Sequence, residues 1–160
     1  MSVHVLESIT TVPVDLPTCW SFFSDPGNLA RITPPSMGFE ITSGAEGRMY
    51  PGQIITYKVK PLLGIPVTWV TEITQVREQE FFIDEQRIGP YRFWHHKHFF
   101  RAVEGGVEMT DVVHYSLPFE PFSLFMVPLV KSKLRGIFEY REKVISRLFS
   151  DDRKSATQTF

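Results

Sequence analysis

Hydrophobic and polar residues alternate first over a short N-terminal segment. Val3–Thr10 is rich in β-branched residues, and this pattern predicts a strand. Asp15 is a candidate helix N-cap and Pro17 suits a first helical turn, so we expect a short helix next. A second short helix is expected over Asn28–Ile32, because Thr33-Pro34-Pro35 then stops helical structure.

The hydrophobic period then changes to two residues, which is the pattern of half-buried strands. Short turns separate these segments, and Glu104-Gly105-Gly106 predicts a tight hairpin. Strands joined by short turns pair antiparallel, so the segments predict an antiparallel sheet. The six strands expected here are Phe39–Thr42, Gln53–Lys60, Val67–Val76, Glu80–Arg87, Tyr91–Val103 and Val107–Leu117.

The last part of the chain has the period of an amphipathic helix. Between Leu129 and Phe149, apolar residues recur about every 3.6 positions, and charged residues occupy the other side. An antiparallel sheet with one apolar face needs a cover, which this helix supplies. The expected fold class is α+β: a seven-stranded curved antiparallel sheet wrapped around a long C-terminal helix, with two short helices after the first strand. We expect one domain over residues 1–150 and a polar tail over residues 151–160.

Composition and charge exclude several classes of protein. The 160 residues have a net charge of −1, so the chain lacks the basic surface of a nucleic-acid binder, and we expect no nucleic-acid partner. Cys19 is the single cysteine, which rules out an intramolecular disulfide. The N-terminus has no apolar signal-peptide core, and no apolar stretch approaches the about 20 residues of a membrane span. We therefore expect a cytoplasmic protein.

Side-chain alternation indicates which face of the sheet is buried. In Tyr91–Val103, one face has Trp94, His96, His98 and Phe100, whereas the other has lysine and arginine, so the first face is expected inside. In the next strand, the face expected inside has Met109, Asp111, Val113 and Tyr115. One strand earlier, Phe82, Asp84 and Gln86 form a similar mixed stripe, although Phe81 and Ile83 compete for the interior.

Polar groups on an apolar inner face need partners, because each unpaired one costs about 1–3 kcal/mol. His96, His98 and Asp111 are the candidate chemical groups, and three roles are open to them. In the first role they form a buried hydrogen-bonded network with Tyr115 and Gln86 that also anchors a ligand. In the second they form an acid–base set in which Asp111 orients a histidine. In the third they form a metal site with N, N and O ligands. We favour the network, and we expect no metal and no cofactor.

Three segments give the chain a resemblance to a known superfamily. They are Ile32-Thr33-Pro34-Pro35, then Gly89-Pro90-Tyr91 followed by Trp94-His95-His96-Lys97-His98-Phe99-Phe100, and Met109-Thr110-Asp111 through Tyr115-Ser116-Leu117-Pro118. With these segments, residues 3–149 resemble the START-related helix-grip superfamily, SRPBCC, and most of all its bacterial ligand-binding and polyketide cyclase-like members. The resemblance implies a sheet that grips the C-terminal helix and binds a hydrophobic or aromatic small molecule between them. It implies no catalytic residues.

The expected function is binding of a small apolar or aromatic molecule in an internal cavity between sheet and helix. One alternative is an enzyme of the cyclase, dehydratase or hydrolase kind that uses a His–Asp pair in the same cavity. Another is a module that docks on a membrane or a partner through the apolar residues 118–128. The expected ligand-binding residues are Tyr57, Trp69, Phe82, Asp84, Gln86, Trp94, His96, His98, Phe100, Met109, Asp111, Val113, Tyr115, Phe125, Leu134 and Phe138.

Overall fold

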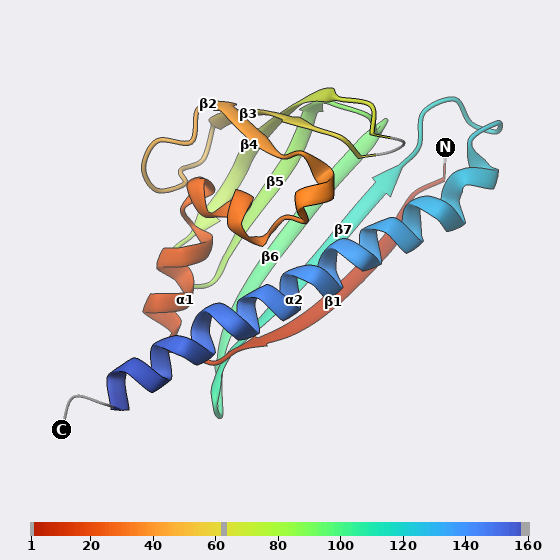
Figure 1. The fold of residues 1–160 in the computed structure, drawn as a ribbon. Coiled ribbons are helices and arrows are strands. Elements are labelled where there is room, and N and C mark those ends of the chain that lie inside the picture. The colour runs from red at the N-terminus through yellow and green to blue at the C-terminus, as the bar shows by residue number, and fades with distance from the viewer. Residues whose placement is uncertain (1, 62–63, 158–160) are drawn as a thin grey trace.

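The computed structural model describes the backbone of residues 2–61 and 64–157, and side chains as far as residue 150. Its architecture is a single sheet with helices on one face (Figure 1). The strands are β1 (His4–Val12), β2 (Glu40–Ser43), β3 (Gln53–Val59), β4 (Val67–Arg77), β5 (Phe81–Ile88), β6 (Phe93–Val103) and β7 (Gly106–Ser116). The helices are α1 (Leu16–Phe23), α2 (Val127–Thr157) and the 3-10 turns η1 (Pro26–Ile32), η2 (Pro35–Met37) and η3 (Leu124–Met126).

The seven strands pair antiparallel in the order β1-β7-β6-β5-β4-β3-β2. The first strand therefore joins the last, while the strands between them follow one another along the chain. Figure 1 shows the sheet curving around α2, which runs lengthwise beside β1 and β7, while α1 closes one end. The predicted fold class is confirmed.

Local sequence signals account for where the elements begin and turn. Asp15 caps α1, because its Oδ1 accepts a 2.8 Å hydrogen bond from the backbone N–H of Thr18. The β6–β7 hairpin turns at Gly105 and Gly106, where φ is +84° and +154°. A Cβ at Gly106 would lie 2.2 Å from the carbonyl oxygen of Val12, so close packing of β1 on β7 requires glycine there.

Buried hydrophobic side chains form three clusters on the inner face of the sheet. One packs α1 against β6, β7 and the end of α2, and includes Trp20, Phe100 and Met109. The second packs the first half of α2 on β1 and β7, and includes Tyr115 and Phe138. The third lies on β3 and β4 with one residue of η2, and contains the residues Met37, Ile55, Tyr57, Val59, Trp69 and Ile73.

Two features of the helices differ from the sequence-based expectation. The helix α2 continues through residues 151–157, which we expected to be a polar tail, whereas residues 158–160 lie outside the described part of the chain. An additional turn, η2, follows η1 because Pro34 and Pro35 start a new 3-10 turn. Among the described helices, none combines the length and the apolar character needed to cross a lipid bilayer.

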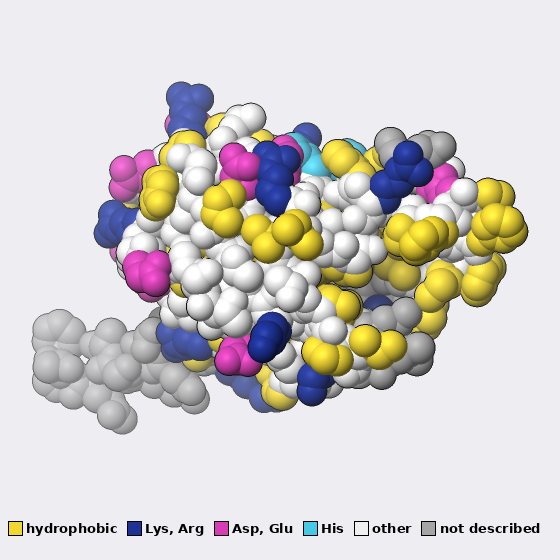
Figure 2. All heavy atoms as spheres, turned by 90° about the horizontal axis from the view of Figure 1, so that it is seen from above, with side chains coloured by type: hydrophobic (Ala, Val, Ile, Leu, Met, Phe, Trp, Pro, Cys, Tyr) yellow, Lys and Arg dark blue, Asp and Glu magenta, His cyan; other side chains and the backbone are white. Residues whose placement is uncertain are grey.

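The connection between β7 and α2 exposes large aromatic side chains. Phe119, Phe122 and Phe125 are each 80–81% exposed, and Leu124 and Leu129 are also exposed. Figure 2 shows hydrophobic side chains gathered at this end of the molecule. We call residues 118–128 the aromatic segment.

Candidate functional site

Three neighbouring strands bring four ionisable side chains together on the inner face of the sheet. His96 and His98 are two residues apart on β6, so both rings point to the same face. On one side Asp84 of β5 pairs with His96, and on the other side Asp111 of β7 pairs with His98. The strand register alone therefore places both imidazoles between two carboxylates. We call these four residues the His–Asp cluster.

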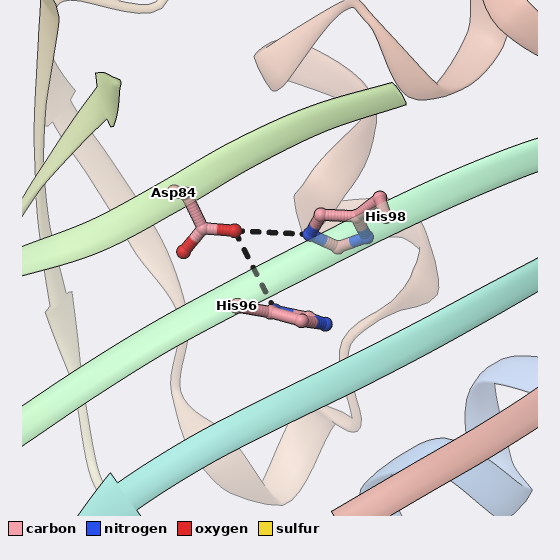
Figure 3. A group of neighbouring side chains, drawn as sticks. All are labelled: Asp84, His96 and His98. Carbon is pink, nitrogen blue, oxygen red and sulfur yellow. Dashed lines mark hydrogen bonds and ion pairs between the residues drawn. The ribbon is translucent and has the colours of Figure 1, made fainter. Parts of the chain in front are cut away.

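Each imidazole of the His–Asp cluster contacts both carboxylates. His96 Nε2 is hydrogen-bonded to Asp111 Oδ1 at 3.0 Å, and His96 Nδ1 lies 3.5 Å from Asp84 Oδ2. His98 Nε2 is hydrogen-bonded to Asp84 Oδ2 at 2.9 Å, whereas His98 Nδ1 lies 2.7 Å from Asp111 Oδ1 without hydrogen-bond geometry. The ring centroids are 3.8 Å apart. Figure 3 shows one carboxylate oxygen of Asp84 facing both rings.

Burial and charge act against each other in the His–Asp cluster. Burial favours the neutral acids, but the imidazoles outweigh it and hold the pKa of Asp84 and of Asp111 below the ordinary value. Burial and the neighbouring charge of His98 lower the pKa of His96. At His98 the effect of burial is outweighed by Asp111 and Asp84, so its pKa is raised. A proton on the imidazole pair therefore favours His98.

A third cationic group comes from the long helix. Arg141 of α2 is 9% exposed, and its guanidinium nitrogen Nη1 lies 3.8 Å from Asp111 Oδ1. The guanidinium also lies over the ring of Phe138, 5.2 Å from the centroid. With Arg141 and a protonated His98, the positive charges balance the two carboxylates, which is the condition for burying them.

The His–Asp cluster forms one wall of a cavity of about 360 Å³ between the sheet and α2. Most lining side chains are apolar and come from all three hydrophobic clusters. Asp84, His96, His98 and Arg141 line the cavity, whereas Asp111 lies behind the imidazoles and is 1% exposed. The other lining residues include Phe23, Ile32, Ile55, Tyr57, Val59, Trp69, Thr71, Ile73, Phe82, Trp94, Leu134, Ile137 and Phe138.

Solved structures share the fold of this chain over almost its whole length. Ara h 8.0201 is 20% identical, with 90% of this chain and 98% of that chain covered and a TM-score of 0.61. The KanY protein (ms6282) is 11% identical, with 94% and 99% covered and a TM-score of 0.71. The chain has the helix-grip fold. No protein-family model matches the chain, and no curated protein matches its sequence.

The helix-grip fold also occurs as one part of a larger protein. A nucleoside-diphosphate sugar epimerase from Corynebacterium glutamicum is 20% identical, with a TM-score of 0.66. The match covers 95% of this chain but 30% of the epimerase chain. Likeness at this level of identity shows the fold alone, so the chemistry of this chain has to be argued from its own side chains.

Nine of the side chains that the sequence suggested as ligand contacts line the cavity. Asp84 and Phe82 face the cavity, so their stripe, and not that of Phe81, is the inner one on β5, although Ile83 is also buried. The nine lining residues are Tyr57, Trp69, Phe82, Asp84, Trp94, His96, His98, Leu134 and Phe138.

Seven other suggested contacts lie outside the cavity wall. Phe100 and Met109 pack beneath α1, while Val113 and Tyr115 pack beneath α2, because the helices cover both ends of these strands. Asp111 is behind the histidines. The remaining two are Gln86, whose amide binds the backbone of Tyr91, and Phe125, which is 81% exposed.

The expected hydrogen-bonded network has different members from those suggested by the sequence. Asp84 joins it through a hydrogen bond and Arg141 through a 3.8 Å ion pair with Asp111, whereas Gln86 and Tyr115 take no part, since the Tyr115 hydroxyl is buried without a hydrogen-bond partner and Gln86 binds the backbone of Tyr91. The sequence analysis missed Arg141. A signal was present, because Leu134, Phe138, Arg141 and Ile145 follow one another at helical spacing on the buried stripe of α2.

The His–Asp cluster supports three kinds of chemistry. The imidazole and carboxylate groups can hydrogen-bond a ligand that enters the cavity. A neutral imidazole beside a carboxylate can also take up or release a proton. Asp84, His96 and His98 each offer a donor atom within 4.8 Å of the other two, so they could hold a metal ion.

Proposed function

We propose that this chain binds a small apolar or aromatic molecule in the cavity between the sheet and α2. The observation that carries the proposal is the composition of the cavity wall. Most of the lining residues are apolar, and four of the ionisable lining groups, Asp84, His96, His98 and Arg141, are gathered at one place on β5, β6 and α2. A largely apolar cavity with a few convergent polar groups is typical of small-molecule sites.

The cavity volume limits the size of the ligand. A cavity of about 150 Å³ accommodates benzene. A volume of about 360 Å³ therefore suits a molecule of about two fused or linked rings. Burial of the rings supplies the affinity at about 25 cal/mol per Å² of apolar surface. A polar substituent at one end of the ligand would meet the His–Asp cluster, which fixes its orientation.

Titration with 2-naphthol tests the proposal, because this molecule has two fused rings and one polar group. Trp69 and Trp94 line the cavity, and their rings are in edge-to-face contact with centroids 5.2 Å apart. Bound naphthol is therefore expected to change tryptophan fluorescence. Substitution Ile137→Trp fills part of the cavity from α2 and is expected to weaken naphthol binding at least tenfold. Native mass spectrometry of the purified protein additionally detects a co-purified small molecule.

The matched control places the same side chain on the outside of the sheet. Ile54 is 46% exposed on β3, so Ile54→Trp leaves the cavity unchanged and is expected to bind naphthol like the parent protein. Fluorescence of each variant is compared with its own ligand-free spectrum, since both add a tryptophan. Equal naphthol affinity in the two variants, or no saturable binding by the folded parent protein, would overturn the proposal.

The aromatic segment supports a second candidate function, docking on an anionic lipid surface. Phe119, Phe122 and Phe125 are exposed together, and Lys131 and Lys133 follow on exposed positions of α2. Exposed aromatic residues beside lysines favour an anionic bilayer interface. Phe119 also lines the cavity, so docking would bring this part of the cavity wall to the lipid surface.

Co-sedimentation with vesicles of phosphatidylcholine and phosphatidylserine tests this second function. Phe125→Asp is expected to reduce the bound fraction by about tenfold, because burying one aromatic side chain is worth about 1.5–3 kcal/mol. Phe93→Asp, on the outer face of β6 and 37% exposed, is the matched control. The function is rejected when both variants, or neither, release the protein from the vesicles.

A further inference from the structure

Three donor atoms converge where the His–Asp cluster meets the cavity. Asp84 Oδ2 lies 2.9 Å from His98 Nε2 and 3.5 Å from His96 Nδ1. Figure 3 shows that the two contacts arise from the same carboxylate oxygen. These separations are close to the spacing of neighbouring ligands around a metal ion with bonds of about 2.0–2.2 Å. Two imidazole nitrogens and one carboxylate oxygen are a donor set for Zn²⁺ and related divalent transition metals.

The far nitrogens of both rings face a second carboxylate. His96 Nε2 lies 3.0 Å and His98 Nδ1 2.7 Å from the same oxygen of Asp111. A metal-bound histidine nearly always directs its other ring nitrogen at a carboxylate, carbonyl or water, and this contact fixes the tautomer. The hydrogen bond from His96 Nε2 to Asp111 leaves the Nδ1 lone pair of His96 directed at Asp84. His98 presents its Nε2 lone pair to a metal ion when its proton is on Nδ1, the nitrogen 2.7 Å from Asp111, and the ion then replaces the hydrogen bond between His98 Nε2 and Asp84.

The two acids therefore have different environments. Asp84 lines the cavity and its side chain is 14% exposed, whereas the side chain of Asp111 is fully buried and in contact with Arg141. A neutral imidazole has one N–H, so it cannot donate to both carboxylates at once. A metal ion on the Asp84 side can take the place of the second proton on His98, because it binds the lone pairs of both rings and the Asp84 oxygen together.

We propose that Asp84, His96 and His98 form a binding site for a divalent transition-metal ion of the Zn²⁺ type. Asp111 is a positioning residue that holds both imidazoles, and Arg141 balances its charge. The site departs from our sequence-based expectation of no metal. The metal alternative considered there used His96, His98 and Asp111, whereas Asp84 was expected only as a ligand contact. It goes beyond ligand binding, and it stands whether or not an apolar molecule enters the cavity.

The position of the site defines the class of further ligand. Three protein ligands leave at least one coordination position on the metal ion, as in catalytic zinc sites. This position faces the apolar cavity, and Arg141 adds a positive charge nearby. A molecule with an apolar body and an oxygen donor, such as a phenolate, carboxylate or enolate, meets both requirements.

Titration of chelator-treated protein with Zn²⁺ or Co²⁺ alone tests the metal site. Calorimetry is expected to give one equivalent of Zn²⁺ per chain, and Co²⁺ is expected to give the visible absorption of a four- or five-coordinate complex. Asp84→Asn is expected to weaken Zn²⁺ binding more than about 100-fold, because even an outer partner of a ligand is worth about 10–100-fold. Asp84 is partly exposed to the cavity, so this variant is chosen to preserve the fold.

Two surface histidines of the same strands provide the matched control. His95 and His114 lie on the outer face with ring centroids 6.2 Å apart. The double variant His95→Gln, His114→Gln is expected to keep Zn²⁺ affinity within about threefold. Loss of binding in this control, retention of binding in Asp84→Asn, or no stoichiometric binding by the folded parent protein would each overturn the metal site.

Asp111→Asn tests the positioning role separately. It is expected to weaken Zn²⁺ binding by about 10–100-fold and to shift the visible bands of bound Co²⁺, because the imidazoles lose an anionic partner. Unshifted bands contradict the positioning role. Should this variant fail to fold, Zn²⁺ binding is measured for His98→Gln alongside Asp84→Asn. Loss of binding in both variants supports the metal site, and retention in either overturns it. Naphthol binding by chelator-treated protein separates failure of the metal site from failure of the proposed ligand binding.

Discussion

The guanidinium of Arg141 and the carboxylate of Asp111 face each other across the interface of α2 and β7, with Nη1 3.8 Å from Oδ1. Arg141→Met keeps the long apolar stem but removes the charge, leaving Asp111 less well compensated in a buried place. We expect the free energy of unfolding to fall by about 2–3 kcal/mol, below the about 3–5 kcal/mol of a hydrogen-bonded buried pair because the contact is long. Urea unfolding followed by circular dichroism measures the loss.

The control for Arg141 is another arginine of the same helix. Arg147 is exposed on α2, so Arg147→Met is expected to change the free energy of unfolding by less than about 0.5 kcal/mol. Arg141→Lys is expected to restore part of the loss, because it returns the charge without the planar guanidinium. An Arg141→Met variant as stable as Arg147→Met would show that Asp111 does not depend on the helix for its charge balance.

A second prediction concerns the thiol of Cys19 in α1. Burial, with a smaller contribution from the charge of Asp15, raises the pKa of Cys19 to about 12. The thiolate is the reactive form, so iodoacetamide at pH 8.5 is expected to modify the folded chain more than about 100-fold more slowly than the chain in urea. Mass spectrometry at timed intervals measures both rates. Similar rates would mean that α1 opens readily or that the thiol is not desolvated.

The same pKa makes stability depend on pH in a defined direction. Below pH 9 the thiol is protonated in both the folded and the unfolded chain, and it has no effect. Between pH 9 and about 12 the unfolded chain loses the proton while the folded chain keeps it, so stability falls as pH rises. At pH 10 the parent protein is expected to have lost about 1.4 kcal/mol more than Cys19→Ala, relative to pH 8. Parallel pH profiles of the two proteins would contradict this.

Gly136 in α2 is a site for stabilisation. It is exposed in the middle of the helix, and a Cβ there would meet no described atom within 4 Å. Gly136→Ala removes backbone freedom from the unfolded chain, so we expect a gain of about 0.5–1 kcal/mol. Thermal unfolding followed at 222 nm measures the change, and a melting temperature at or below that of the parent protein would refute it.

Gly106 at the start of β7 is expected to respond in the opposite way. A Cβ there would lie 2.2 Å from the carbonyl oxygen of Val12, so Gly106→Ala forces β1 and β7 apart and costs more than about 1 kcal/mol. Gly105→Ala is the matched control, because Gly105 also has positive φ but a Cβ there would meet no described atom within 4 Å. Equal losses in the two variants would assign the cost to backbone conformation and not to strand packing.

Alternation along β6 and β7 was enough to group His96, His98 and Asp111 on the inner face of the sheet. A period of two assigns side chains to faces, and the hairpin at Gly105 makes the inner faces adjacent. The antiparallel order followed from the short turns, and the period of 3.6 identified α2. These signals are local in sequence, so the sequence alone is sufficient to recognise them.

Alternation could not predict which side chains of the inner face are covered by helices and which line the cavity. Phe100 and His98 share a face, yet Phe100 packs under Trp20 and Phe23 of α1, while His98 lines the cavity. Which part of a strand is covered depends on where the helices cross it, and that is set by packing between distant segments. The same reason explains why Asp84, and not Asp111, faces the cavity.

The placement of the four charged residues has a consequence for how the sheet assembles. His96 pairs with Asp84 in β5 while His98 pairs with Asp111 in β7, so two separate alignments must both be right for the charges to be neutralised. A slip of β6 by one residue would turn Lys97 inward and leave two acids buried beside the wrong neighbours, at a cost of several kcal/mol. Charge neutralisation therefore adds to hydrophobic burial in favouring the native register of β5, β6 and β7, so a sheet with β6 out of register would be less stable than the native one.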